Sequence, residues 1–178
     1  PGETLSVTAI TELELALCRA PAQGGLPVRL ITPDACVQET RGQGTNTRQV
    51  CNILFANLPA ERLLITEVIT PPGHWSSYPP HKHDEDNLPH ESALEETYYH
   101  RINPPQGFAF QRVYTDDRSL DEAMAVEDGD VTLVPKGHHP CGAPYGYEIY
   151  YLNVMAGPLR KWRFKNDPDH DWIYQRDL

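Results

Sequence analysis

The sequence predicts an all-β domain, built as a sandwich or barrel of short strands. Seventeen Pro and twelve Gly residues are scattered over 178 positions without a period, which is typical of many turns between short elements and not of a helical bundle. Between these turns, apolar and polar residues alternate in short runs, the pattern of strands with one buried face. The length corresponds to one domain, or to one domain and part of another.

Four segments in the first half of the chain have the residue pattern of a strand: residues 12–18, 28–31, 48–54 and 63–69. In the first of them, Leu13, Leu15 and Leu17 fall on one face. A stretch over residues 20–27 that contains Pro and Gly follows and breaks the pattern. Because strand-like sequence begins so close to Pro1, we expect the chain to be a fragment joined partway through a longer protein.

Strand patterns continue at regular spacing through the second half: residues 81–83, 96–100, 108–114, 131–134, 147–154 and 161–164. Turn sequences such as Pro104-Pro-Gln-Gly107 separate them. The one helical signal starts at Ser119, where Ser-Leu-Asp-Glu has the pattern of a capping box and opens a short apolar run to Val126. We therefore expect a short helix over residues 119–126.

The charge balance excludes several classes of partner. Fifteen Lys and Arg residues against 25 Asp and Glu residues give a formal charge of −10, so neither nucleic acid nor an anionic membrane surface is an expected partner. The longest apolar run, residues 53–56, is far shorter than the ~20 residues of a membrane helix. Four Cys residues form no CxxC pair, so we expect reduced thiols in a soluble, cytoplasmic protein.

Histidine is enriched in one region, since seven of the eight His residues lie between positions 74 and 139. Among them, His81 and His83 flank Lys82, and alternate residues of a strand share a face about 6.5–7 Å apart. Both imidazoles can then bind one metal ion at Zn–N distances of about 2.0–2.1 Å. Two His residues at this spacing also occur on solvated strands, so further ligands are needed to indicate a metal site.

Two segments supply further ligand candidates. Glu96 begins an aromatic strand, and strand phase puts its carboxylate on the inner face beside Tyr98, while Glu95 faces the opposite way. A carboxylate in that position is costly to bury unless a cation or a donor pairs with it. The later Pro-x-Gly turn presents His138 and His139, of which one faces inward. Strand phase favours Glu96 over Glu95, and the choice between His138 and His139 stays open on these grounds.

These residues resemble the two motifs of the cupin family, a glycine followed by HxH and Glu, and a second glycine followed by Pro-x-Gly and His. The matching positions are Gly73, His81, His83 and Glu96 in the first motif and Gly129, Pro135, Gly137 and His139 in the second. The sequence departs from the pattern in two places. The gap between His83 and Glu96 is longer than usual, and His139 follows Gly137 by two residues instead of three.

Longer strings resemble the family of 5-deoxy-glucuronate isomerases of myo-inositol catabolism, which is related to the 5-keto-4-deoxyuronate isomerases. The strings are Pro80 to Asp84, Leu94 to Tyr99, Gln111 to Glu122, Val134 to Gly137 and Tyr151 to Pro158. They lie within a region of about 80 residues, and weaker similarity extends from Leu13 to Trp172.

The resemblance implies a jelly-roll barrel, the double-stranded β-helix of the cupins, with one metal ion in its mouth. Because the family is a bicupin, residues 1–25 would be the end of an N-terminal lobe with a linker, and residues 26–178 the C-terminal metal-binding lobe. The implied ligands are His81, His83, Glu96 and His139. Three imidazoles and one carboxylate suit several divalent ions, and we expect zinc, with manganese, iron and nickel as alternatives. Relatives of this type assemble through their barrels, so a homo-oligomer is expected.

The resemblance also implies an aldose–ketose isomerisation of a small sugar acid, from 5-deoxy-D-glucuronate to 2-deoxy-5-keto-D-gluconate. This reaction needs a group that moves a proton between adjacent carbons. Tyr98 and Tyr151 are the catalytic candidates if strand phase turns them inward, and Glu148 or Glu95 would serve only if the phase is reversed. The alternatives are another cupin metalloenzyme, a uronate isomerase or a dioxygenase, and a non-catalytic sugar-binding cupin.

A sugar acid also needs a cation for its carboxylate. Arg112, Arg118 and Lys136 lie near the motifs, and we select Arg112 and Lys136 as the substrate-binding candidates. Arg112 is the first choice because a guanidinium matches a carboxylate in two hydrogen bonds.

Overall fold

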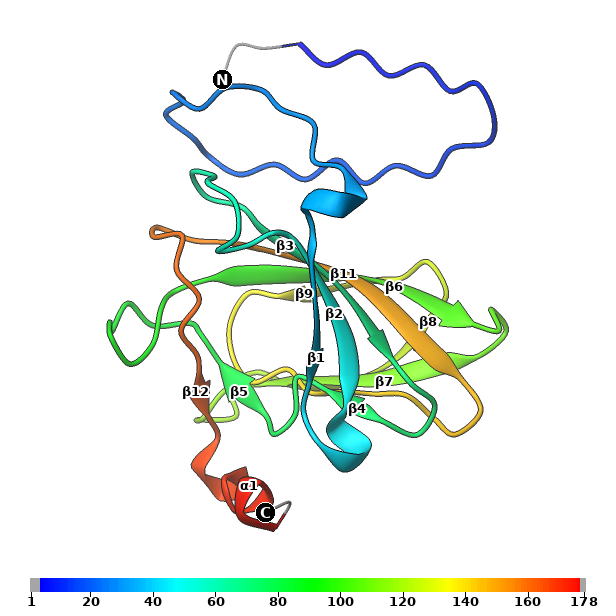
Figure 1. Cartoon of the computed structure of the whole chain (residues 1–178). Coiled ribbons are helices and arrows are strands. Elements are labelled where there is room, and N and C mark those ends of the chain that lie inside the picture. The colour runs from blue at the N-terminus through cyan, green and yellow to red at the C-terminus, as the bar shows by residue number, and fades with distance from the viewer. Residues whose placement is uncertain (1–3, 177–178) are drawn as a thin grey trace.

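The computed structural model describes residues 4–176 and consists mainly of antiparallel strands (Figure 1). The strands are β1 (Val37–Arg41), β2 (Arg48–Leu54), β3 (Leu64–Thr70), β4 (Trp75–Ser76), β5 (His81–Lys82), β6 (Glu95–Asn103), β7 (Phe108–Tyr114), β8 (Asp121–Glu127), β9 (Val131–Val134), β10 (Cys141–Gly142), β11 (Glu148–Ala156) and β12 (Lys165–Asn166). The helices are three short 3-10 turns (Pro33–Ala35, Gly44–Asn46 and Pro168–His170) and α1 (Trp172–Arg176). The all-β prediction is confirmed.

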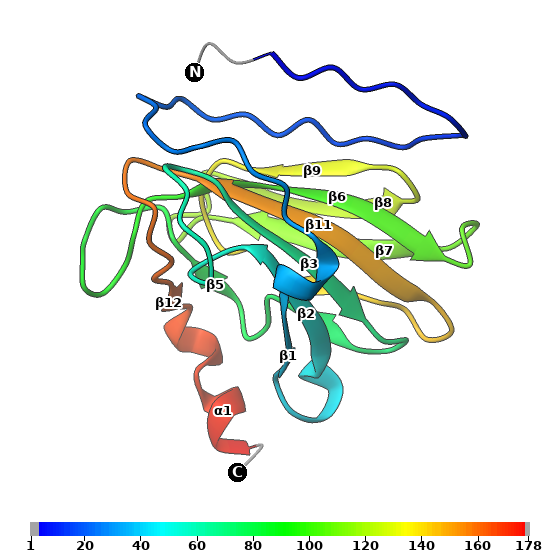
Figure 2. The same ribbon diagram turned by 45° about the horizontal axis from the view of Figure 1, so that its top comes forward.

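Two antiparallel sheets face each other and form a barrel of the jelly-roll type, as expected (Figures 1 and 2). The larger sheet has the order β1-β2-β3-β11-β6-β9, and the smaller has the order β4-β10-β7-β8. In β6 and β11 every second residue is buried, so one face of each strand points into the barrel. The main core cluster lies between the sheets and contains Val50, Val68, Tyr98, Val113, Val134 and Tyr151.

Most of the predicted strands are confirmed. Residues 48–54, 108–114 and 131–134 form β2, β7 and β9 with the predicted bounds, and β3, β6 and β11 agree within three residues at each end. Period-two alternation predicts these strands well because each has a partner on at least one side and one buried face. The sequence did not predict β1, the short strands β4 and β10, or α1.

The strands expected over residues 12–18 and 28–31 are wrong, since neither segment is part of a sheet. The leucines of the first segment are 52%, 61% and 64% exposed. An extended segment becomes a strand only when another strand accepts and donates its backbone hydrogen bonds, and the part of the chain that is described offers no such partner. The segment instead crosses the larger sheet, where Glu14 accepts a hydrogen bond from the Tyr99 hydroxyl at 2.6 Å (Figure 1).

The helix expected over residues 119–126 is also wrong, because these residues belong to a hairpin of β7 with β8. The hydroxyl of Ser119 donates to Asp117 within the turn and does not cap a helix. Burial alternates along β8, with Val126 buried and Ala125 exposed. Pairing with β7 along seven residues therefore outweighs the local capping pattern.

Residues 161–164 were expected to form a strand, but the strand β12 begins only at Lys165 and pairs with β5. Trp162 and Phe164 of the irregular segment lie against His81, with ring centroids 6.3 and 4.7 Å from the imidazole. The C-terminal segment therefore covers the side of the barrel on which β5 lies. Within residues 4–176, no helix is long and apolar enough to cross a membrane.

His100 on β6 is a fully buried imidazole in the barrel. Its Nε2 atom lies 3.1 Å from Oε1 of Gln111 and donates a hydrogen bond to it. Burial lowers the pKa of His100 from 6.5 to about 4. The folded protein therefore holds this side chain in its neutral form.

We expect stability to be lost as the pH falls from 6.5 towards about 4, because the unfolded chain takes up a proton at His100 in this range and the folded chain does not. The full effect is about 3 kcal/mol. In urea unfolding, the free energy of unfolding of the wild type should fall more steeply over this pH range than that of His100→Gln. Parallel pH profiles would contradict the prediction.

Candidate metal centre

Three imidazoles meet at one end of the barrel. His81 lies on β5, His83 follows that strand, and His139 lies in the loop before β10. Each is at most 9% exposed, and one ring nitrogen from each lies within 4.8 Å of the other two. The HxH spacing therefore places His81 and His83 on one face, and Lys82 between them contacts a separate set of carboxylates.

Gly137 determines where His139 lies. Its φ angle is +93°, and a Cβ atom at this position would lie 2.4 Å from the carbonyl oxygen of Tyr114. Only glycine tolerates both the left-handed backbone and this close approach. The turn after β9 therefore passes close to β7 and directs His139 into the barrel.

Glu96 adds a carboxylate to the three imidazoles. It lies on β6, is 4% exposed, and places Oε1 at 2.7 Å from Nε2 of His139 and 3.2 Å from Nε2 of His83. Its other oxygen, Oε2, accepts a hydrogen bond from Nδ2 of Asn153 at 2.6 Å. Glu95 is exposed and lies on the opposite face of the strand. The structure thus brings together the four residues selected from the sequence as metal ligands.

Backbone hydrogen bonds determine which imidazole nitrogens carry protons. Nδ1 of His83 lies 3.2 Å from the carbonyl oxygen of Leu94, and Nδ1 of His139 lies 2.9 Å from that of Gly137, so each Nδ1 donates. The two Nε2 atoms then carry lone pairs, and both are buried without a hydrogen-bond partner in the described chain. Lone pairs this close to the Glu96 carboxylate repel it unless a cation lies among them. These residues fit a divalent metal ion.

The charges within the cluster also favour the binding of a cation among these side chains. Burial lowers the pKa of His81 well below its ordinary value, so this imidazole is neutral and free to bind a metal. Burial opposes ionisation of Glu96, but His139 and His83 hold the pKa of that carboxyl well below its usual range. Conversely, Glu96 outweighs burial and raises the pKa of His83. The carboxylate therefore attracts a positive charge to this position, from a proton or from a metal ion.

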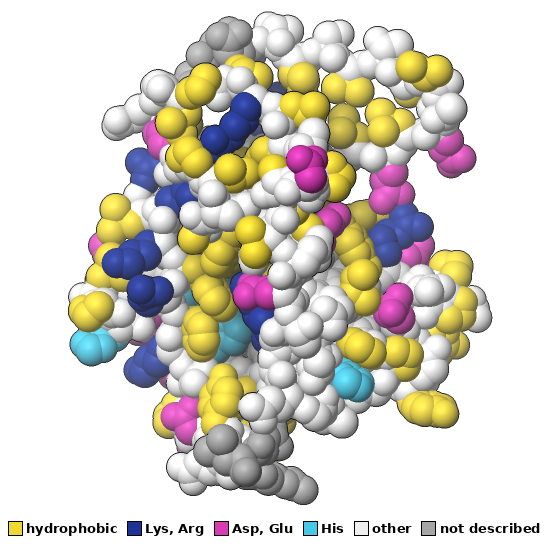
Figure 3. Space-filling model, in the orientation of Figure 1, with side chains coloured by type: hydrophobic (Ala, Val, Ile, Leu, Met, Phe, Trp, Pro, Cys, Tyr) yellow, Lys and Arg dark blue, Asp and Glu magenta, His cyan; other side chains and the backbone are white. Residues whose placement is uncertain are grey.

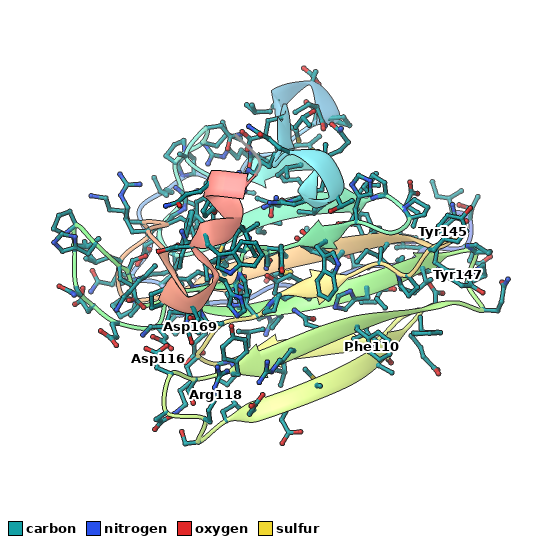
Figure 4. The ribbon with its side chains drawn as sticks, turned by 90° about the horizontal axis from the view of Figure 1, so that it is seen from below. Phe110, Asp116, Arg118, Tyr145, Tyr147 and Asp169 are labelled. Atoms are coloured by element: carbon teal, nitrogen blue, oxygen red, sulfur yellow. The ribbon has the colours of Figure 1, made fainter. Side chains whose placement is uncertain are left out.

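His138, the alternative to His139, faces away from the cluster. Its Nε2 atom lies 2.8 Å from Asp116, and its ring packs on Tyr114 with centroids 5.0 Å apart. Figure 4 shows Asp116 close to Arg118 and Asp169 at one end of the molecule. These three side chains line a separate cavity of about 210 Å³.

The two tyrosines expected to be catalytic line the cavity beside the cluster. The Tyr98 hydroxyl lies 3.0 Å from Oγ of Ser77 and donates to Glu96 Oε1 at 3.4 Å. The Tyr151 hydroxyl lies 2.6 Å from Oγ of Ser76. Burial raises the pKa of Tyr98 well above its ordinary value and that of Tyr151 to about 12. Both side chains are therefore proton donors at neutral pH.

The two cations selected from the sequence are not brought to the cluster. Arg112 lies on the outer face of β7 and forms two hydrogen bonds of 2.7 Å with the carboxylate of Asp121. Lys136 is exposed in the turn after β9. Neither residue lines the cavity beside the three imidazoles.

Two other arginines, Arg41 and Arg48, do line this cavity, and the sequence analysis missed both. Arg48 shares a strand face with the buried residues Val50 and Asn52. The alternation of residue types along residues 48–54 therefore indicates that the Arg48 side chain points inward. Arg41 belongs to β1, which the sequence did not predict.

The cavity beside the cluster is narrow, with a volume of about 40 Å³, enough for roughly three water molecules. Arg41, Phe55 and Trp162 meet at its lining, with the Arg41 guanidinium 5.9 Å from the Phe55 ring and 5.1 Å from the Trp162 ring. On the face seen in Figure 3, histidine and basic side chains lie next to each other in a recess bordered by hydrophobic side chains. Larger hollows of about 410 and 510 Å³ lie beneath residues 17–21 and contain no histidine.

Comparison with known proteins identifies the family. The sequence pattern of the KduI/IolB family matches residues 1–173. The chain belongs to this family. It is 62% identical over 177 residues to a 5-deoxy-glucuronate isomerase of Geobacillus kaustophilus, covering 99% of this chain and 64% of the relative. It is 58% identical over 171 residues to that of Bacillus subtilis strain 168, covering 96% and 63%.

The family resemblance inferred from the motifs is thus confirmed, and the chain spans less than two thirds of the length of these relatives. The crystal structure of an IolB-like protein from Salmonella typhimurium superposes with a TM-score of 0.84 and 59% identity, covering 86% of this chain and 59% of that chain. The polyketide cyclase RemF from Streptomyces resistomycificus has a TM-score of 0.53 and 18% identity over 84% of this chain and 93% of its own. The similarity to RemF concerns the fold alone.

We expect this KduI/IolB chain to bind a divalent ion, and the two neighbouring histidines provide a matched test. His139→Ala removes a nitrogen directed at Glu96 and should lower metal affinity by more than roughly 100-fold. His138→Ala removes an equally buried imidazole that faces away and should leave affinity unchanged. Metal content by plasma mass spectrometry and titration with a chromophoric chelator measure both effects. Equal losses in the two variants would contradict the assignment.

Proposed function

We propose that this chain is the metal-binding part of a sugar-acid isomerase that converts 5-deoxy-D-glucuronate into 2-deoxy-5-keto-D-gluconate. Relatives about 60% identical over nearly the whole chain carry the name 5-deoxy-glucuronate isomerase. The observation that carries the proposal is the buried group of three imidazoles around Glu96, with two Nε2 atoms that lack a partner in the described chain.

An aldose–ketose isomerisation moves a proton between neighbouring carbons and exchanges which of two oxygens is the carbonyl. A divalent ion held by His81, His83, His139 and Glu96 supplies Lewis-acid polarisation of these oxygens when bound. Tyr98 and Tyr151 line the same cavity and keep their protons at neutral pH. Each can donate a hydrogen bond to an oxygen on which negative charge develops. Ser77 and Ser76 hold the two hydroxyls in place.

Several features of the proposed enzyme rest on the family resemblance. Zinc is the proposed ion, because three imidazoles and one carboxylate suit it. The division into residues 1–25 and 26–178, the homo-oligomeric state and the cytoplasmic location stay predictions.

We expect the zinc-loaded protein to convert 5-deoxy-D-glucuronate to the ketose in an NMR assay. In deuterated water, the product should gain deuterium on the carbon that receives the proton. Removal of the metal should lower the rate by ~100-fold or more, and a divalent ion should restore it. Full activity after rigorous metal removal would contradict the role of the metal, and a product free of deuterium would indicate a hydride shift.

Trp162 lines the cavity beside the cluster, so a sugar acid that binds there changes the surroundings of this side chain. The chain contains three Trp residues, and replacing Trp75 and Trp172 with Phe leaves Trp162 as the fluorophore. We expect saturating D-glucuronate to change the emission of this variant. The matched variant that retains only Trp75, on the smaller sheet, should not respond. Unchanged Trp162 emission would contradict binding at this cavity.

A further inference from the structure

We propose that Arg48 binds the carboxylate of the substrate and makes the site selective for sugar acids over neutral sugars. This inference rests on the proposed function, because it assigns one end of the substrate of that reaction. It differs from the expectation drawn from the sequence, which selected Arg112 and Lys136 for this role.

Arg48 is held in a fixed position inside the barrel. It is the first residue of β2 and lines the same cavity as His81 and Tyr151. Its Nη1 atom donates to the backbone oxygen of Asn46 at 2.9 Å and to the side-chain oxygen of Asn46 at 2.5 Å. Nε and Nη2 make no hydrogen bond to any residue from 4 to 176 and are therefore free to bind a ligand.

The charge of Arg48 has no counterion in the described chain. Its cross-strand neighbour is Arg41, and like charges directly opposite each other on adjacent strands are destabilising. Glu39 neutralises Arg41 at 2.5 Å, whereas no carboxylate of the described residues lies within 4.0 Å of Arg48. Glu96 also lines the cavity, but it accepts a hydrogen bond from Asn153 and faces His83 and His139, and it forms no ion pair with Arg48. A guanidinium in this setting is costly to bury unless an anion joins it.

A carboxylate is the anion that this guanidinium matches best. Nε and Nη2 form a planar pair of donors that a carboxylate accepts in two parallel hydrogen bonds. A uronate has its carboxylate at one end and its reacting carbonyl at the other. With the carboxylate on Arg48, the carbonyl end can extend towards His81 and His83, which line the same cavity. Arg112 offers no such site because Asp121 already occupies its two donors.

The test compares binding of D-glucuronate and of D-glucose to the zinc-loaded protein by isothermal titration calorimetry. Arg48→Met should weaken glucuronate binding by roughly 10- to 100-fold and leave any glucose binding unchanged. Arg48→Lys keeps the charge but not the paired donors, so its affinity for glucuronate should lie between those of the wild type and Arg48→Met. Arg112→Met is the matched control and should bind glucuronate as the wild type does. Metal content and the thermal midpoint of each variant show that the cluster and the fold are intact.

Each outcome has a definite meaning. Wild-type affinity for glucuronate in Arg48→Met, or in Arg48→Lys should the first variant not fold, overturns the inference. So does a wild type that fails to bind glucuronate, or an equal loss in Arg112→Met. If the wild type binds glucuronate through Arg48 but isomerises no sugar acid, the proposed reaction is wrong and the assignment of Arg48 is supported.

Discussion

The arrangement of the site depends on one constraint, the burial of the Glu96 carboxylate beside two imidazole nitrogens that carry lone pairs. Glu96 lies on β6, between β11 and β9, with Met155 and Val134 as its cross-strand partners. Because β6 is paired on both sides, its backbone has little freedom to relax at this position. Groups that repel each other are therefore held together by the sheet, and a cation relieves the repulsion. The free energy that holds the site in place comes from the ladder of strands around it.

A second buried charge connects the two segments that carry the imidazoles. The Lys82 ammonium lies 2.8 Å from Asp84 and 3.5 Å from Glu91, and Asp84 accepts a hydrogen bond from the backbone of Gly137 at 2.7 Å. The residue between His81 and His83 thus links β5 to the turn that presents His139. Because the lysine is only 4% exposed in its side chain, this link is shielded from water and is stronger than a surface ion pair. The network acts on the imidazoles by positioning them.

Strand phase explains both what could be predicted and what could not. Alternation assigns each residue of a paired strand to a face, so the sequence predicts that Glu96 shares a face with Tyr98, while the phase of Tyr151 is decided only by the structure. It does not reveal whether a segment has a partner, which is why residues 12–18 were predicted as a strand. At residues 119–126 the local capping motif predicts a helix, and pairing with β7 makes the segment a strand instead. Proximity to the motifs in sequence does not point to Arg48, because β2 approaches the cluster only through the pairing of strands in the larger sheet.

In the proposed enzyme, a metal ion at the imidazoles and Arg48 at the other end of the cavity would together determine how a sugar acid binds. A carboxylate is also a good ligand for a divalent ion, so a metal alone would accept either end of the molecule and bind many simple acids. The Arg48 guanidinium would make one orientation of the sugar acid more favourable, because it can form two charge-assisted hydrogen bonds with the carboxylate. The carbonyl and its neighbouring hydroxyl would then lie at the metal-binding end. The acidic protein, with a formal charge of −10, repels anions over most of its surface. In the proposed enzyme, a metal ion and Arg48 would therefore supply the attraction as well as the orientation.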